Sequence, residues 1–286
     1  MKTLLIGSEG QVGTEIIRVF GPGLVACDVP EVDITDRSTI DRAFAACSPD
    51  MVINTAAYHN VPDCEKNPET AFRVNVLGVR NLAAACRAAG CGLVHFSTDY
   101  VFDGRKSGPY DENDVPCPLN TYAISKLAGE FFARLVDRHY VVRLSSVFGV
   151  AGSKGKGGSN FVKAMLAKAR AGERARVSVN ITSSPTYARD AARLVRELLE
   201  SGHPPGVYHG ANGGACTWHE FAVEIFRLIG YKTTVEEKVE TEEEAGVRRP
   251  LYSALVSVKL PPQRSWKDAL VEYLKDEGYP PQETQT

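Results

Sequence analysis

The chain has 286 residues, of which 43% are hydrophobic and 24% charged, a composition typical of folded globular proteins and not of disordered or fibrous ones. Its 33 basic and 35 acidic side chains leave a formal charge of −2, which gives no general electrostatic reason to bind nucleic acid or an anionic membrane. The length predicts about two domains, or one large domain with an appendage.

The N-terminal half alternates short apolar runs with helix-like segments. The apolar runs predict five strands, at residues 4–6, 24–27, 51–53, 93–96 and 140–144. Apolar residues at helical spacing predict the helices between them, near residues 12–20, 38–44, 71–89 and 122–136. Strands that are apolar on both faces and separated by helices indicate a covered parallel sheet, so we predict an α/β fold with a Rossmann-type doubly wound sheet.

The pattern changes after residue 149. A basic, glycine-rich loop at residues 152–158 lacks the Gly-Lys-Ser/Thr ending of a phosphate loop and is interpreted as a flexible connection. Further helices are predicted near residues 161–171, 191–199, 221–229 and 266–274, and the acidic run at 235–244 as a solvated face. We assign residues 1–150 to a dinucleotide-binding domain, to which 174–200 return, and residues 151–173 and 201–286 to a smaller C-terminal substrate-binding domain.

Three glycines, Gly7, Gly10 and Gly13, lie between the first strand and the first helix. Glycine permits the tight turn there and allows a pyrophosphate to approach the backbone. The amides of Gly10, Gln11 and Val12 would then face the phosphates at the positive end of the helix. The alternative is a tight turn that binds no ligand.

Asp28 ends the second strand, near the spacing from Gly7 that is expected for an acid binding the adenosine ribose. A carboxylate there accepts hydrogen bonds from both ribose hydroxyls and repels a 2′-phosphate, which by itself favours NAD(H). The alternative is a surface acid at a strand end. Asp33 and Ile34, in the next loop, are placed to flank the adenine.

Tyr122 and Lys126 are one helical turn apart, and Ser97 and Thr98 end the fourth strand, at the edge where open parallel sheets bind ligands. With the glycine turn, they predict a ketone-reducing site, in which a nicotinamide gives hydride and a phenol gives a proton. Lys126 would lower the phenol pKa and bind the nicotinamide ribose, and Thr98 would hold the carbonyl oxygen. Asn75 either supports a water-linked proton path or has a structural role.

These residues and the strings around them resemble the dTDP-4-dehydrorhamnose reductase family of the extended short-chain dehydrogenase/reductases. The most specific match is Ser-Thr-Asp-Tyr-Val-Phe-Asp-Gly at residues 97–104. The other matches span nearly the whole chain, at residues 7–13, 54–58, 118–130, 160–161, 185–186, 207–209, 217–218 and 248–250. Related sugar-nucleotide dehydratases tend to carry Glu where Tyr100 stands, so the resemblance favours a reductase.

The resemblance implies NAD(P)H-dependent reduction of the 4-keto group of a nucleotide-linked deoxysugar, most closely dTDP-4-dehydro-L-rhamnose to dTDP-L-rhamnose. The implied catalytic residues are Thr98, Tyr122 and Lys126. The implied contacts to NADP(H) or NAD(H) are Gly7, Gly10, Gln11, Val12, Asp28, Asp33, Ile34, Ala56, Ala57, Tyr58, Tyr122 and Lys126. The implied substrate contacts are Thr98, Asp99, Tyr100, Ser146, Asn160 and Arg249, the last facing the nucleotide diphosphate.

Three departures from the family affect the substrate pocket. The family usually has Trp where Ser146 stands, Asp-Gln where Val179 and Asn180 stand, and Asp or Asn near residues 255–257. Two alternatives therefore stay open: a dinucleotide-binding regulatory subunit resembling that of methionine adenosyltransferase, or a reductase or epimerase acting on another nucleotide sugar. The assembly also stays open, with a homodimer as the form to test.

Seven cysteines stand without any C-x-x-C pair, which excludes the usual zinc-ribbon and thioredoxin spacings. We therefore expect buried or half-buried free thiols in a reducing compartment, and no metal site. The first apolar run ends at Gly7, too short for a signal peptide, and no apolar stretch approaches the roughly 18 residues of a membrane span. The expected location is the cytoplasm.

Overall fold

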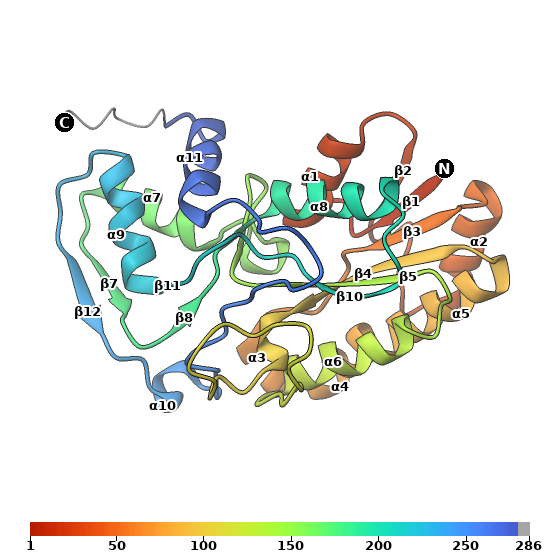
Figure 1. Cartoon of the computed structure of the whole chain (residues 1–286), viewed down its shortest axis with the longest axis horizontal. Coiled ribbons are helices and arrows are strands. Elements are labelled where there is room, and N and C mark those ends of the chain that lie inside the picture. Colours follow the sequence, from red (N-terminus) through yellow and green to blue (C-terminus); the bar gives the residue numbers. More distant parts are fainter. Residues whose placement is uncertain (280–286) are drawn as a thin grey trace.

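The computed structural model describes residues 1–279, and its central element is a six-stranded, all-parallel sheet ordered β10-β5-β4-β3-β1-β2 (Figure 1). The strands are β1 (Thr3–Ile6), β2 (Leu24–Cys27), β3 (Met51–Asn54), β4 (Gly92–Thr98), β5 (His139–Leu144) and β10 (Gly206–His209). The order reverses between β1 and β3, where an open α/β sheet leaves a crevice for a ligand. The α/β, Rossmann-type prediction is confirmed; β10 adds a sixth strand, too short and too polar to be recognised from its apolar pattern.

Helices cover both faces of this sheet. One face carries α1 (Gln11–Phe20) and α8 (Ala188–Glu200), and the other carries α2 (Arg37–Cys47), α5 (Val79–Ala89) and α6 (Thr121–Ala133). Successive strand residues alternate between the two layers. In β1, Leu4 and Ile6 join the core beneath α2 and α5, whereas Leu5 joins the core beneath α1 and α8. This alternation explains why the strands are apolar on both sides.

The predicted helix at 71–89 is divided in the structure. It consists of α4 (Pro68–Phe72), a π-helical segment (Arg73–Gly78) and α5, and a short helix, α3 (Val61–Lys66), precedes it. A side chain at Gly78 would overlap Ile34, since an added Cβ would lie 2.6 Å from the Ile34 side chain. The widened helical turn therefore lies where the segment packs closely on the loop after β2, in a geometry that is often found near functional sites.

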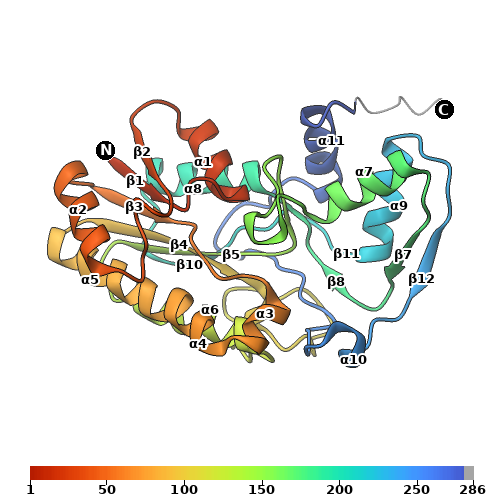
Figure 2. The ribbon, with the colours of Figure 1, turned by 180° about the vertical axis from the view of Figure 1, so that it is seen from behind.

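A second core lies beside the sheet, in the C-terminal part of the chain (Figure 2). The helices that contribute to this core are α7 (Phe161–Ala171), α9 (Trp218–Leu228) and α11 (Trp266–Asp276); α10 (Glu242–Ala245), in the same part of the chain, has no buried residue. The short strands of this part are β6 (Val147–Phe148), β7 (Ala175–Ser178), β8 (Thr182–Ser183), β9 (Thr186–Tyr187), β11 (Cys216–Thr217) and β12 (Val235–Lys238). Buried aromatic rings fill the centre, including Phe148, Tyr187, Phe221 and Tyr273. The domain limits given above stay a prediction, and residues 280–286 lie outside the described chain.

All seven cysteines lie within the described residues and are free thiols. Six are buried or half-buried, as predicted, but Cys117 is exposed, so the prediction is wrong for that residue. Within residues 1–279, no helix combines the length and the apolar composition that crossing a membrane requires.

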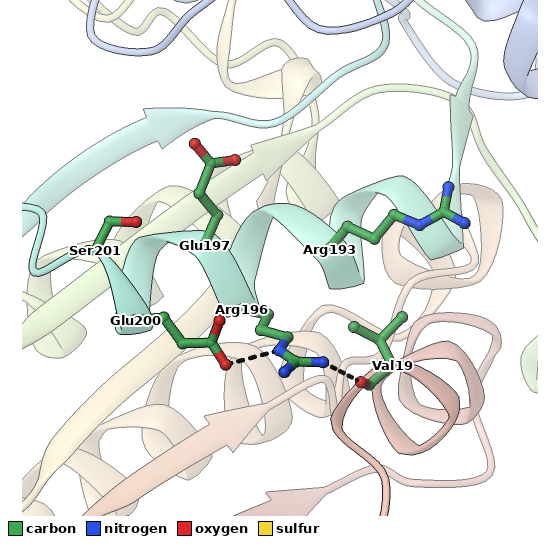
Figure 3. A pocket seen from close by; sticks show the side chains of 6 residues that line it. All are labelled: Val19, Arg193, Arg196, Glu197, Glu200 and Ser201. Atoms are coloured by element: carbon green, nitrogen blue, oxygen red, sulfur yellow. Dashed lines mark hydrogen bonds and ion pairs between the residues drawn. The ribbon is translucent and has the colours of Figure 1, made fainter.

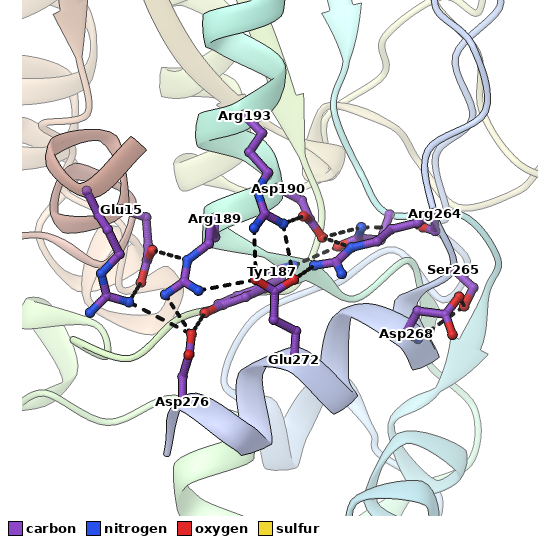
Figure 4. A network of polar contacts seen from close by, with 12 residues as sticks. Glu15, Tyr187, Arg189, Asp190, Arg193, Arg264, Ser265, Asp268, Glu272 and Asp276 are labelled. Atoms are coloured by element: carbon purple, nitrogen blue, oxygen red, sulfur yellow. Dashed lines mark hydrogen bonds and ion pairs between the residues drawn. The ribbon is translucent and has the colours of Figure 1, made fainter. Parts of the chain in front are cut away.

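A network of charged side chains ties α11 to α8 and α1 (Figure 4). Arg189 of α8 donates to Glu15 of α1 at 2.8 Å and pairs with Asp276 of α11 at 2.6 Å. The Glu15 side chain is only 2% exposed, so its charge has little compensation from water. The arginine therefore both neutralises a buried carboxylate and links the C-terminal helix to the sheet layer.

Replacing Arg189 by Met should lower the free energy of unfolding by about 3 kcal/mol, because Glu15 would keep a buried charge without its main partner. Urea-induced unfolding of both proteins measures the change. Arg37→Met is the matched control, since Arg37 and Asp41 form an exposed pair expected to contribute less than about 0.5 kcal/mol. Equal losses from the two variants would contradict this interpretation.

Candidate functional site

The glycine turn after β1 is closed against neighbouring backbone. Gly7 has a φ of +85°, and an added Cβ there would lie 2.6 Å from Thr55 Oγ1. An added Cβ on Gly13 would lie 2.3 Å from the Gly7 carbonyl oxygen. Gly10 is the N-cap of α1, and no side chain caps this helix end. The turn thus presents the open N-terminus of a ten-residue helix, which fits the pyrophosphate of a dinucleotide.

Gln11 and Asn160 link this turn to the start of α7. The Gln11 amide donates to the Val147 carbonyl at 3.0 Å, and the Asn160 amide donates to Gln11 Oε1 at 3.1 Å. Asn160 also caps α7 by accepting from the Lys163 amide at 2.9 Å. Asn160 is thus engaged with the glycine turn and with its own helix, and its role as a substrate contact stays a prediction.

The predicted ribose acid, Asp28, lies against the glycine turn. Its carboxylate accepts from the Glu9 amide at 2.8 Å and from the Val29 amide at 2.9 Å. The two adenine-flanking candidates are engaged locally. Asp33 accepts from the amide and the hydroxyl of Thr35, both at 2.8 Å, and the Ile34 side chain is buried.

The segment after β3 is held by a buried amide. Asn75, in the π-helical segment, accepts from the Tyr58 amide and donates to the Tyr58 carbonyl, both at 2.8 Å. It also donates to the hydroxyl of Ser125 on α6 at 3.0 Å. Asn75 therefore joins the predicted cofactor segment, Ala56 to Tyr58, to the helix that carries Tyr122, which is the structural role considered above.

The structure brings Thr98, Tyr122 and Lys126 together at the carboxyl end of β4. Thr98 ends the strand, and the other two side chains come from the first two turns of α6. The Tyr122 phenol lies near enough to Thr98 for the threonine side chain to favour its ionised form, and the Lys126 ammonium donates to the Phe96 carbonyl at 2.7 Å. Tyr100 lies edge-on to Tyr122, with ring centroids 6.2 Å apart. The catalytic roles of the three residues stay a prediction.

Burial dominates the ionisation of the trio. It raises the pKa of Tyr122 well above that of a free phenol, and the nearby Thr98 side chain opposes this only in part. Burial also lowers the pKa of Lys126 to about 8, against an opposing effect of Glu130. The expectation that Lys126, together with a positive nicotinamide ring, lowers the phenol pKa concerns the cofactor-bound site and stays a prediction. The phenol is protonated at neutral pH, as a proton donor has to be.

A buried ion pair lies beneath the trio. Glu130 of α6 accepts from Arg143 of β5 at 2.7 and 2.9 Å and from the hydroxyl of Ser97, next to Thr98, at 2.5 Å. The Glu130 and Arg143 side chains are 2% and 5% exposed. Gly129 of the same helix packs closely on the π-helical segment, since an added Cβ there would lie 2.4 Å from the Asn75 carbonyl oxygen. The ion pair and this close contact hold α6 against the strand ends and the π-helical segment.

Caps hold the beginning of α6. The Asn120 side chain accepts from the Ala123 amide at 2.9 Å and donates to the Arg248 carbonyl at 2.9 Å. Glu65 accepts from the amide and hydroxyl of Thr121, at 2.6 and 2.8 Å. Sequence reasoning missed Glu65, because no local spacing relates a residue of α3 to a helix 56 positions later.

Asp99 is a buried carboxylate surrounded by hydroxyl groups. It accepts from Ser253 at 2.5 Å, from Ser145 at 2.8 Å and from Thr98 at 3.1 Å. Burial raises the pKa of Asp99 to about 6, although the three hydroxyls oppose the shift. Its side chain therefore accepts hydrogen bonds from Thr98 and from two serines, and its role as a substrate contact stays a prediction. Ser145 and Ser253 are two site residues that sequence reasoning missed.

Two other predicted substrate residues, Ser146 and Arg249, border the trio. Ser146 has a φ of +44°, a left-handed conformation that costs a non-glycine residue about 1 kcal/mol or more, and its hydroxyl hydrogen-bonds to Ser183 at 2.8 Å. Arg249 pairs with Glu240 at 3.1 Å. Its buried Nε has no partner within residues 1–279, so the guanidinium keeps a free donor.

A surface hollow on the α8 side is separate from these residues (Figure 3). Arg196 there pairs with Glu200 at 2.7 Å and donates to the Val19 carbonyl at 3.1 Å. The hollow contains none of the predicted site residues, and its exposed i, i+4 ion pair is typical of a solvated helix face. Its lining consists of Val19, Arg193, Arg196, Glu197, Glu200 and Ser201.

Comparison with known proteins relates the whole chain to one group. The sequence profile of the family described as RmlD substrate binding domain matches residues 1–278. The spore coat polysaccharide biosynthesis protein SpsK of Bacillus subtilis is 37% identical, over 96% of this chain and 97% of its own length. A dTDP-4-dehydrorhamnose reductase of Streptomyces griseus is 34% identical, over 94% and 91%. The crystal structure of dTDP-4-dehydrorhamnose reductase from Bacillus anthracis in complex with NADP superimposes with a TM-score of 0.91 at 32% identity, covering 96% of this chain and all of that one.

The environment of Asp99 predicts a pH-dependent contribution to stability. Its pKa is about 6 in the folded chain and about 3.9 for an ordinary Asp, so folding favours the protonated form. This stabilisation is complete below about pH 4 and is lost as the pH rises through about 6. Asp99→Asn cannot titrate. The free energy of unfolding of the wild type, relative to this variant, should therefore fall by about 3 kcal/mol between about pH 4 and about pH 7.

Urea unfolding at a series of pH values measures that difference, and the variant itself controls for all other titrating groups. A difference that stays constant over the range would show that Asp99 is not buried as a protonatable group.

Proposed function

The chain belongs to the RmlD substrate binding domain family, and from that membership we propose that it reduces the 4-keto group of a nucleotide-linked deoxysugar with a nicotinamide dinucleotide. The observation that carries the proposal is the convergence of Thr98, Tyr122 and Lys126 beside the glycine turn. We propose dTDP-4-dehydro-L-rhamnose as the substrate, because dTDP-4-dehydrorhamnose reductases are among the relatives that match along nearly the full chain.

The residues of the glycine turn fit a dinucleotide cofactor. Gly10, Gln11 and Val12 would hold its pyrophosphate with backbone amides, and Asp28 would bind the adenosine ribose. The segment held by Asn75 would line the nicotinamide side. When bound, the cofactor supplies the hydride for the keto carbon.

The proton for the new hydroxyl group comes from a side chain of this protein. The Tyr122 phenol, neutral because burial raises its pKa, donates its proton to the oxygen that becomes an alkoxide. The Thr98 hydroxyl, whose single proton is donated to Asp99 in the chain without substrate, would turn that proton to the same oxygen and hold it in place. The Lys126 ammonium is one turn away and stabilises the phenolate that remains after the transfer.

Arg249 and Tyr100 supply the substrate side of the site. Arg249 lies close enough to Tyr100 to favour its ionised form electrostatically, and it keeps one buried donor free. A guanidinium with a free donor is suited to a nucleotide diphosphate. Ser146, smaller than the Trp usual in the family, would leave more room beside the sugar, which supports testing several nucleotide sugars.

Tyr122→Phe should lower kcat by about 10² to 10⁴-fold, because the proton donor is lost while the ring remains. The assay follows the disappearance of reduced-nicotinamide absorbance with dTDP-4-dehydro-L-rhamnose and with either reduced dinucleotide. Dinucleotide binding, measured by calorimetry, serves as the control and should persist in the variant.

Full activity of Tyr122→Phe would contradict the assignment of the proton donor. Binding of dinucleotide with no turnover of any keto sugar would favour the regulatory-subunit alternative. Interconversion of two nucleotide sugars without net oxidation of added NAD(P)H would favour an epimerase.

A further inference from the structure

The basic loop between β6 and α7 reaches back over the N-terminal sheet (Figure 2, the green segment before α7). It is closed on itself by a bridge between Ser153 and Ser159 and contains a short 3₁₀ turn, Lys154–Lys156. The Ser153 hydroxyl hydrogen-bonds to His59 Nε2 at 2.6 Å. An added Cβ on Gly155 would lie 2.9 Å from the His59 ring, so backbone and ring are in close contact. The loop is therefore anchored to the segment after β3.

The next residue of the loop, Lys154, lies at the predicted ribose site. Its ammonium is 3.3 Å from Asp28 Oδ1 and also pairs with Glu9 of the glycine turn. The Asp28 side chain is 11% exposed, whereas those of Lys154 and Glu9 are 51% and 63% exposed. In the part of the chain that the structure describes, Lys154 is the single cation that forms an ion pair with either carboxylate.

The charges around Asp28 determine whether the site favours an adenosine ribose with a free 2′-hydroxyl or one with a 2′-phosphate. Asp28 and Glu9 bring two negative charges, which oppose a 2′-phosphate carrying up to two more. A ribose with a free 2′-hydroxyl needs no cation, because it donates to the Asp28 carboxylate. A 2′-phosphate needs a partner of opposite charge, and an exposed ammonium on a long, flexible stem can turn from a carboxylate to a phosphate.

We propose that Lys154 is the specificity-determining residue that allows this chain to accept a 2′-phosphorylated dinucleotide despite the ribose acid Asp28. The inference rests on the proposed function, since it concerns the cofactor of that same site. A cation from the loop before α7 offsets the acid at the end of β2, so the pair of residues, and not Asp28 alone, sets the balance between NADPH and NADH.

The test measures dissociation constants of NADPH and NADH by calorimetry, in the full chain and without sugar. Lys154→Gln should weaken NADPH binding about tenfold, which corresponds to the loss of one charge-assisted hydrogen bond. NADH binding should change by less than about twofold, because its ribose does not need the ammonium. Lys154→Arg, which keeps the charge, should keep the wild-type ratio of the two constants.

Lys156→Gln is the matched control, because it removes the same charge from the same loop. Lys156 is close enough to Arg249 for their charges to repel, and it should leave the NADPH-to-NADH ratio unchanged. An unchanged ratio in Lys154→Gln, or an equal shift in both Gln variants, would overturn the proposal. If either occurs in a protein that still reduces the keto sugar, the proposed function stands and this inference alone fails. A wild-type chain that binds neither dinucleotide would refute both.

Discussion

A buried ion pair, Glu130 with Arg143, holds the helix that carries Tyr122 and Lys126 against the strand ends. Because Glu130 also accepts from Ser97, the residue before Thr98, one carboxylate fixes α6 relative to both β4 and β5. A buried pair of this kind gains little net stability over an apolar contact, since both charges lose their hydration. Its value here is geometric, because it fixes the position of α6, and with it Tyr122 and Lys126, relative to Thr98 at the end of β4.

The same burial that fixes the geometry also sets the protonation states. Tyr122 stays neutral and Lys126 has a pKa of about 8, so exclusion of water moves the pKa values of both groups away from their ordinary values. Asp99 follows the same rule, with a carboxyl pKa of about 6. An approaching positive charge would shift the pKa of Tyr122 in the opposite direction, so the proposed proton donor would ionise more readily beside a cation.

The sequence predicted the parts of the molecule that depend on local pattern. Five of the six strands of the main sheet, the glycine turn and the helix beginning near Tyr122 all follow from apolar periodicity and from residues close together in the chain. What the sequence did not predict depends on contacts between distant segments. Asp99 is surrounded by hydroxyls from positions 46 and 154 residues away, and no spacing rule connects them. The upward effect of burial on the Tyr122 pKa was also not predicted, since burial is a property of the folded chain.

The hydrogen bond from Ser253 to Asp99 has a consequence for the order in which the molecule is made. A ribosome synthesises the chain from its N-terminus, so the strands from β1 to β5 can pair before residue 253 has emerged. Until then, the carboxylate beside Thr98 lacks one of its three hydroxyl partners. Completion of the hydroxyl cluster around Asp99 is thereby coupled to arrival of the last tenth or so of the polypeptide, and a nascent chain that stalls earlier would have strands β1 to β5 but not the complete cluster.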